Sequence, residues 1–79
     1  MKVYAVLNED RQHGVDVDLF YDKEDAIEVA RDIARDNASY AEDIEEQELT
    51  QEMLNDGWVL DVTYSIEEDR VCVLKRELK

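Results

Sequence analysis

The chain has 79 residues, of which 44% are apolar and 39% are charged. Its 22 acidic and 9 basic residues give a formal net charge of −13 at pH 7. This length predicts one domain, residues 1–79, and the apolar content argues against a wholly disordered acidic tail. The charge argues against direct binding to nucleic acid or to an anionic membrane surface, because both need clustered Lys and Arg.

The first third of the chain predicts two strands joined by a polar loop. Lys2–Leu7 is rich in β-branched and aromatic residues, and Asn8–Gly14 is polar and ends in glycine, as hairpin loops do. Val15–Tyr21 then alternates apolar and polar residues, which predicts a strand with one buried side. The apolar set that we expect to be buried is Val15, Val17, Leu19 and Tyr21.

A helix is predicted from Asp22, which can act as the N-cap, to about Ala38. Apolar residues at helical spacing form one stripe, and their small size predicts a close approach to a sheet. That stripe consists of Ala26, Ile27, Ala30, Ile33, Ala34 and Ala38. The outer face offers two ion pairs at three-residue spacing, Glu28–Arg31 and Asp32–Arg35.

The following segment, Ser39 to Leu49, leaves three interpretations open: a continued helix, a short edge strand, or an acidic loop. A short helix is then predicted over Gln51–Asn55, because Thr50 can cap its first turn. Gly57 can take the left-handed conformation that commonly ends a helix.

Two further strands are predicted, Trp58–Ile66 and Arg70–Glu77, with an acidic turn between them. The apolar run within the second of these predicts a central strand. One face of the first should carry Trp58, Leu60, Val62, Tyr64 and Ile66. The expected fold is α+β in the order β-β-α-(α)-β-β, an antiparallel four-stranded sheet with one long and one short helix on one face.

Residues suited to chemistry are few. His13 is the only histidine and has no nucleophile near it in the sequence, and Cys72 lies among the apolar residues of a strand. Asp16 and Asp18 share a strand face and could hold a divalent cation, but no calcium-loop spacing accompanies them. We therefore expect no enzyme activity, no cofactor and no bound metal.

The densest acidic run is the most unusual feature, since no Lys or Arg occurs between Asp36 and Asp69. Such a run is most often a solvated surface, but rows of carboxylates can also imitate a phosphate backbone. The candidate partner-binding residues are Glu42, Asp43, Glu45, Glu46, Glu48 and Glu52, with Asp16 and Asp18 as a second patch.

Two segments carry a resemblance to known proteins. Met1–Val6, followed by Leu19–Ala26, resembles the strand-loop-strand-helix start of small uncharacterised proteins of phages and mobile elements. In size and acidity the chain also resembles phage-encoded DNA-mimic inhibitors of restriction or CRISPR systems. That likeness lies in composition and not in a motif, so it transfers no functional residue.

The sequence therefore predicts a non-enzymatic acidic interaction protein that blocks a basic DNA- or RNA-binding site on a host defence protein, such as a CRISPR effector. The alternative is a small structural or regulatory domain of a halophile, whose acidic surface serves solubility. The start of the chain is too short for a signal peptide, so we expect a cytoplasmic location, in the host if the protein is viral. A homodimer through exposed edge strands is also possible.

Because uncompensated negative charge destabilises the compact state, added salt should stabilise this domain. We expect the thermal midpoint to rise between about 20 mM and 1 M NaCl, as screening shortens the range of repulsion severalfold. Circular dichroism melts at both salt concentrations measure this. A midpoint that does not change would contradict the prediction, and a fold that is absent at about 0.15 M salt would favour the halophilic alternative.

Overall fold

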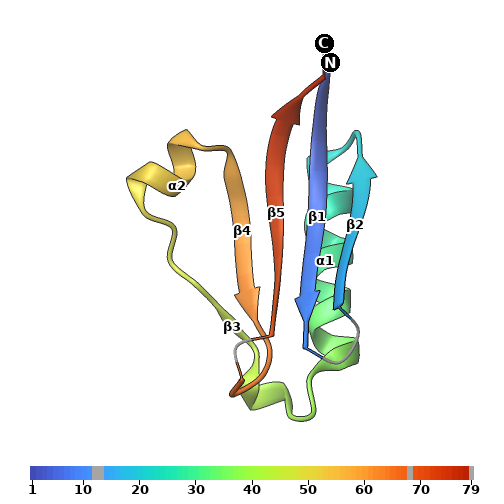
Figure 1. The fold of residues 1–79 in the computed structure, drawn as a ribbon, viewed down its shortest axis with the longest axis vertical. Helices are drawn as coiled ribbons and strands as arrows, with labels where there is room; N and C mark the ends of the chain where they lie inside the picture. The colour runs from blue at the N-terminus through green and yellow to red at the C-terminus, as the bar shows by residue number, and fades with distance from the viewer. Residues whose placement is uncertain (12–13, 68, 79) are drawn as a thin grey trace.

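The computed structural model describes residues 1–11, 14–67 and 69–78. Its elements form two layers, a sheet and one long helix behind it (Figure 1). In chain order they are β1 (Lys2–Asp10), β2 (Gly14–Phe20), α1 (Lys23–Asn37), the 3-10 turn η1 (Ala41–Asp43), β3 (Glu45–Glu46), α2 (Gln51–Asn55), β4 (Trp58–Thr63) and β5 (Arg70–Glu77).

The sheet has five antiparallel strands in the order β2-β1-β5-β4-β3. The last strand along the chain, β5, is therefore the central one, as its apolar run predicts. It pairs with β1 over eight positions, from Lys2↔Glu77 to Glu9↔Arg70. None of the helices in the described part of the chain is long and apolar enough to cross a membrane.

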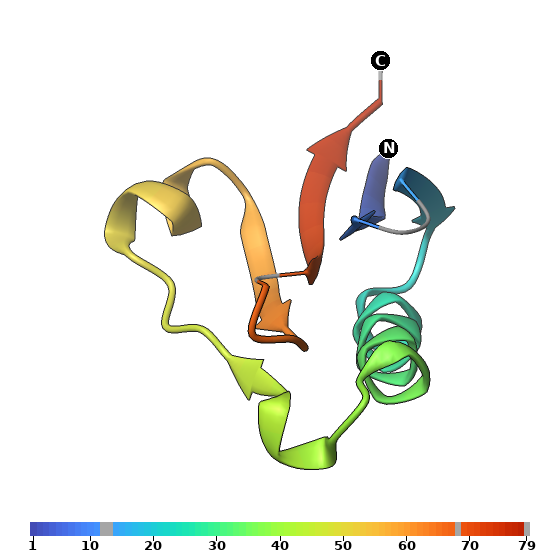
Figure 2. The same cartoon turned by 60° about the horizontal axis from the view of Figure 1, so that its bottom comes forward.

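The predicted α+β class is confirmed, but the predicted layout of four strands and two helices on one face is wrong. The ambiguous acidic segment supplies a fifth strand, because Glu45 and Glu46 pair with Thr63 and Val62 at the edge of the sheet. Among the described residues, α1 is the one helix of substantial length. The five-residue α2 lies beyond the β4 edge, apart from α1 (Figure 2).

The core lies between α1 and the middle of the sheet. Asp22 caps α1 by accepting hydrogen bonds from the backbone N–H groups of Glu24 and Asp25. The helix then buries three alanines completely, and because these side chains are short the helix axis can lie close to the strands. The fully buried cluster comprises Ala26, Ala30, Ala34, Val6, Val62, Tyr64, Val71 and Val73.

No helix of the described residues lies over the opposite face of the sheet, which we call the open face; it faces the viewer in Figure 1. Successive residues of a strand point to opposite faces of the sheet. The residues that alternate with the core positions therefore point to the open face. The apolar set of β2 pairs with such positions, as in Ala5↔Leu19 and Leu7↔Val17. Val15, Val17 and Leu19 of β2 are therefore exposed, contrary to the prediction, at 65%, 56% and 61%. Tyr21, which was predicted on the same side, lies just beyond β2 and is 75% exposed.

A register shift in β4 changes the face of one predicted core residue. Trp58 pairs with Leu74, whereas Leu60 pairs with Val73, so the strand has a bulge between Trp58 and Leu60. A bulge inserts one residue and reverses the alternation beyond it. Trp58 consequently shares the open face with Leu74, while Val62 and Tyr64 keep the predicted position in the core. Ile66, predicted on the same face, lies beyond the strand and is 89% exposed.

The short helix α2 forms where it is predicted. The Thr50 hydroxyl accepts a hydrogen bond from the Met53 N–H, and the helix ends before Gly57, whose φ is +95°. The Gly57 carbonyl also accepts a bond of 2.7 Å from the Lys75 N–H, so the chain passes close to β5 here. A Cβ at Gly57 would lie 2.6 Å from the Lys75 carbonyl oxygen.

Gly57→Ala should therefore destabilise the fold more than Gly14→Ala. Both glycines have positive φ, which costs an alanine about 1–2 kcal/mol, but at Gly14 a Cβ meets nothing within 4 Å. We expect a loss of about 1–2 kcal/mol for Gly14→Ala and at least about 1 kcal/mol more for Gly57→Ala. Urea unfolding of the two variants measures the difference, and equal losses would contradict the close approach at Gly57.

Candidate interaction surfaces

The predicted acidic run does not form one continuous surface, because β3 turns its neighbouring residues to opposite sides. Glu45 and Glu48 line a groove of about 700 Å³ beside the open face, together with Asp61 and Arg70. Glu46 points to the helix side, where its Oε1 lies 2.8 Å from Nε of Arg31. That contact neutralises one of the predicted partner-binding acids.

The remaining acids of the run lie on separate elements. Glu42 and Asp43 belong to η1, below the C-terminal end of α1, and Glu52 lies in the first turn of α2. Asp16 and Asp18 lie on β2, at the opposite edge of the sheet from β3. Of the eight predicted residues, all within the described ranges, Glu46 is the one with an ion pair.

Asp16 and Asp18 form a surface with α1 that the sequence did not reveal. Both point to the helix side and line a shallow groove with Ile33 and Asn37 of α1. With a rotation of 100° per residue, four positions of α1 lie next to Ile33 on the side away from the core alanines: 25, 29, 32 and 36. Three of these four positions are aspartates, so the acids of β2 and of α1 lie along neighbouring ridges.

Glu28 also lacks its expected partner, but it lies on another side of α1, where it lines a hollow with Arg31 and Arg35. Arg31 contacts Glu46 across the layers, so the predicted Glu28–Arg31 pair is wrong, whereas the predicted Asp32–Arg35 pair is present. We call the exposed acids of β2, together with those that flank Ile33 without an ion pair, the helix-side acidic surface. It consists of Asp16, Asp18, Asp25 and Asp36.

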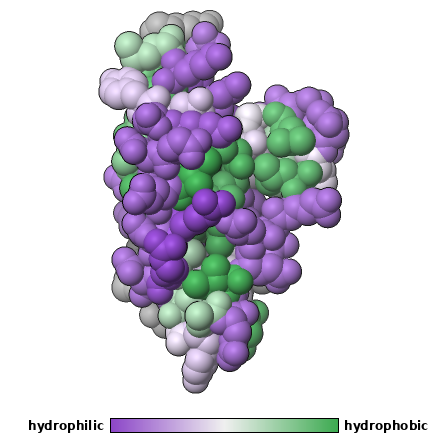
Figure 3. All heavy atoms as spheres, turned by 180° about the vertical axis from the view of Figure 1, so that it is seen from behind, coloured by the Kyte–Doolittle hydropathy of each residue, from purple (hydrophilic) through white to green (hydrophobic). Residues whose placement is uncertain are grey.

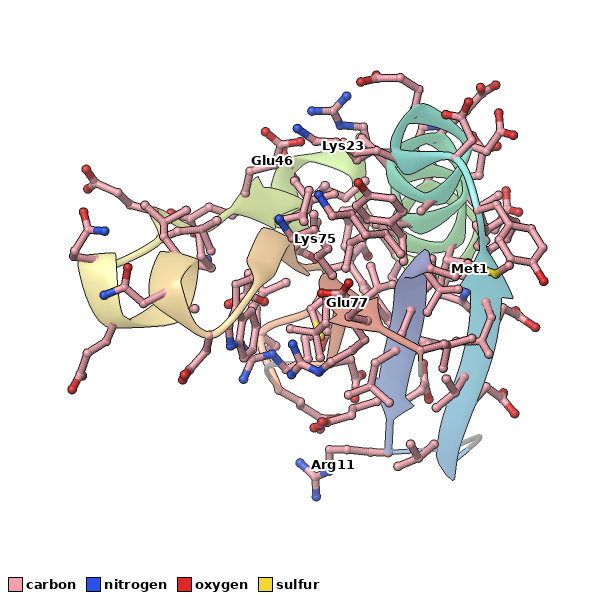
Figure 4. All side chains as sticks on the ribbon, turned by 90° about the horizontal axis from the view of Figure 1, so that it is seen from above. Met1, Arg11, Lys23, Glu46, Lys75 and Glu77 are labelled. Atoms are coloured by element: carbon pink, nitrogen blue, oxygen red, sulfur yellow. The ribbon has the colours of Figure 1, made fainter. Side chains whose placement is uncertain are left out.

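This side of the molecule is hydrophilic over most of its area (Figure 3). Figure 4 shows oxygen-tipped side chains projecting outward around α1, and it labels Lys23 and Lys75 on the flank of α1 away from β2. The helix-side acidic surface therefore keeps its negative charge.

The arginines, by contrast, are used within the fold. Four of the five form ion pairs with acids of the same chain, and Arg76 donates from Nη1 to the carbonyl oxygens of Asp56 and Lys75. The four pairs are Arg11–Glu67, Arg31–Glu46, Arg35–Asp32 and Arg70–Asp61. The side chains of the arginines are therefore engaged within the chain itself, three of the ion pairs at the surface and one, Arg70–Asp61, largely buried.

The pair on the open face is the most buried of the four. Asp61 is 3% exposed and accepts hydrogen bonds from Nε and Nη2 of Arg70, at 3.3 and 2.5 Å. The Arg70 guanidinium also lies 5.6 Å from the ring centroid of Trp58, a cation–π distance. Burial disfavours the charged guanidinium, but the hydrogen bonds and charge of Asp61 outweigh it and raise the pKa of Arg70.

A second polar cluster closes the lower end of the core. The Tyr64 hydroxyl donates to Oδ2 of Asp10 at 2.7 Å and accepts from Nδ2 of Asn8 at 3.0 Å. Burial, followed by the hydrogen bond to Asp10, raises the pKa of Tyr64 above its ordinary value of 10. Every buried side-chain nitrogen and oxygen in the described ranges has a partner, so this cluster is structural.

Cys72 lies at the centre of the open face and is 2% exposed. Burial, followed by the charge of Asp61, raises the pKa of its thiol to about 11. The thiol is therefore protonated near neutral pH and acts as a small apolar side chain, which agrees with the interpretation from sequence. His13 lies outside the described residues. Within them, no group of three His, Cys, Asp or Glu residues is arranged to hold a metal ion.

The open face carries apolar residues on each of four strands. The register places Leu19, Ala5, Leu74 and Trp58 in one row, and Val17, Leu7, Cys72 and Asp61 in the next. A third row holds Val15, Glu9, Arg70 and Thr63, and Val3 pairs with Arg76 at the other end. On these four strands the open face thus carries two acids and two arginines, whose charges cancel.

No protein-family model matches the chain, and comparison with curated proteins and with solved structures likewise found no match. The charge and exposure of the helix-side acidic surface and of the open face are therefore what bears on function.

The raised pKa of Cys72 makes stability depend on alkaline pH. The pKa of the thiol is about 11 in the folded state and 9.0 in the unfolded state. The contribution of the buried thiol to the free energy of unfolding is therefore complete below pH 9.0 and is lost as the pH rises through about 11. We expect the stability difference between the wild type and Cys72→Ala to shrink by up to about 1.4 kcal/mol per pH unit in this window. Urea unfolding at pH 8, 9, 10 and 11 measures it, and a constant difference would contradict the burial of the thiol.

Proposed function

We propose that the protein is a non-enzymatic acidic binding protein that occupies a cation-rich, nucleic-acid-binding site on another protein. The observation that carries this proposal is the helix-side acidic surface, whose four carboxylates have no ion-pair partner among the described residues. Acids that are not neutralised within the fold are available to the arginines and lysines of a partner.

The spacing of these acids supports the same partner class. Asp16 and Asp18 are about 6.6–6.8 Å apart along a strand, and Asp25 and Asp36 are about 16–17 Å apart along the axis of α1. The strand and the helix thus present two adjacent lines of negative charge, and basic grooves that bind a nucleic-acid backbone are complementary to such an arrangement. A host defence protein that binds DNA or RNA, such as a CRISPR effector, is the partner class we propose.

The β3 edge provides the natural comparison. The acids around this edge, Glu42, Glu48 and Glu52, are exposed like those of the helix side. However, Arg31 of α1 reaches across to pair with Glu46 of β3, and Arg70 lies in the adjacent groove. We therefore place the main contact on the helix side, and the β3 edge acids at its periphery. The acidic run, which is the first candidate from the sequence, thus takes the peripheral position.

The test is a competition experiment with two charge-matched triple variants. The protein should displace a fluorescent oligonucleotide from nucleic-acid-binding defence proteins, including a CRISPR effector, and displacement should weaken between about 50 and 300 mM NaCl. The variant Asp18→Lys, Asp25→Lys, Asp36→Lys should lose at least about tenfold in apparent affinity. The variant Glu42→Lys, Glu48→Lys, Glu52→Lys changes the net charge equally and should lose less.

Anisotropy of the labelled oligonucleotide measures both variants, and circular dichroism verifies that they are folded. Equal losses would mean that net charge alone matters and would overturn the assignment of the site. The absence of displacement across the panel at low salt would overturn the function and favour an acidic surface that serves solubility.

A further inference from the structure

We propose that two copies of this chain pack open face to open face in a two-fold symmetric dimer. The first observation is the orientation of β2. Its alternation places Val15, Val17 and Leu19 on the open face, where each is more than half exposed, while Asp16 and Asp18 take the helix side. A strand with one strictly apolar side is typical of burial on that side, and nothing in the described chain covers it.

The exposed residues of β2 belong to a larger apolar area. They continue across β1 and β5 through Ala5, Leu7 and Leu74, and reach Trp58 on β4. Contiguous apolar areas of this kind on a small protein usually mark an interaction surface.

Charge identifies the occupant as a second copy. The chain carries −13 overall, yet the charges of the open face on β2, β1, β5 and β4 cancel. Two copies that met through any other surface would bring like charges together, at about 1 kcal/mol per pair at 4 Å even in water. Face-to-face packing instead keeps the helix-side acidic surfaces on the outside, at opposite ends of the dimer.

The orientation also follows from charge. Arg76 lies at one end of the open face and Glu9 at the other, because Arg76 pairs with Val3 and Glu9 with Arg70. A two-fold axis that lies in the interface and runs across the strands places the Arg76 end of one copy over the Glu9 end of the other. Two aligned sheets packed in this way form a sandwich with a core about 10 Å thick.

The area of the open face is sufficient for a dimer of modest affinity. Four strands about 4.8 Å apart and about seven residues long give a flat footprint of roughly 450 Å² per copy. Two footprints give roughly 900 Å², and the relief of the side chains raises the accessible area above that value, toward the roughly 1,000 Å² of a specific interface. A dissociation constant in roughly the micromolar range is therefore expected.

Sedimentation equilibrium of the wild type, Val17→Lys and Asp18→Lys tests the proposal. These neighbouring residues lie on opposite faces of β2, and both changes make the net charge less negative, so repulsion cannot explain a lost dimer. We expect the wild type and Asp18→Lys to reach twice the 9.3 kDa chain mass with rising concentration, and Val17→Lys to remain a monomer. A dimer that survives in Val17→Lys points to pairing through the β2 edge and overturns face-to-face packing. A wild type that stays monomeric at roughly 0.5 mM also overturns the proposal.

A second measurement needs no variant. Trp58, the only tryptophan, lies on the open face, so its fluorescence emission should shift to shorter wavelength as the wild type dimerises. Added salt should tighten the dimer severalfold by screening repulsion between the two acidic chains, whereas it should weaken binding to a basic partner. An emission maximum that does not change while the mass doubles would place the interface elsewhere and overturn the proposal.

Discussion

The contact between the alanine stripe of α1 and the central strands determines the rest of the structure. Ala26, Ala30 and Ala34 are fully buried against a sheet whose facing residues include Val71 and Val73. Because these side chains are short, the helix lies close to the strands and one helix suffices to close the core. A single narrow helix also leaves β2 with only partial cover and the second face of the sheet with none. The helix-side acidic surface and the open face both follow from this arrangement.

Sequence patterns predicted the elements that depend on local chemistry. Asp22 and Thr50 cap their helices as expected, the alanine stripe faces the core, and β5 is central. Long-range geometry was not predictable in the same way. The pairing of Glu45 with Thr63 depends on where a distant strand ends, and acidic residues have low strand propensity, so the fifth strand was one of three open alternatives.

The candidate site shows the same limit. Alternation correctly separated the apolar from the acidic side of β2, but which side is buried depends on the position of α1 and not on the strand itself. Arg31 has an acid three residues before it on its own helix and another across the layers, and the fold selects Glu46. The sequence therefore located the acids but could not say which of them the fold leaves without a partner.

The central position of β5 has a consequence for how the chain reaches its native state. Strands β1 and β2 form one local hairpin, and β4 and β5 form another. The two hairpins join only through the pairing of β1 with β5, as in Leu7↔Cys72, between residues near opposite ends of the chain. Such contacts between residues far apart in sequence raise the contact order, and closing the long intervening loop costs entropy before the sheet gains its central ladder. Folding should accordingly be slow for so small a domain, with the docking of the two hairpins under α1 as its limiting step.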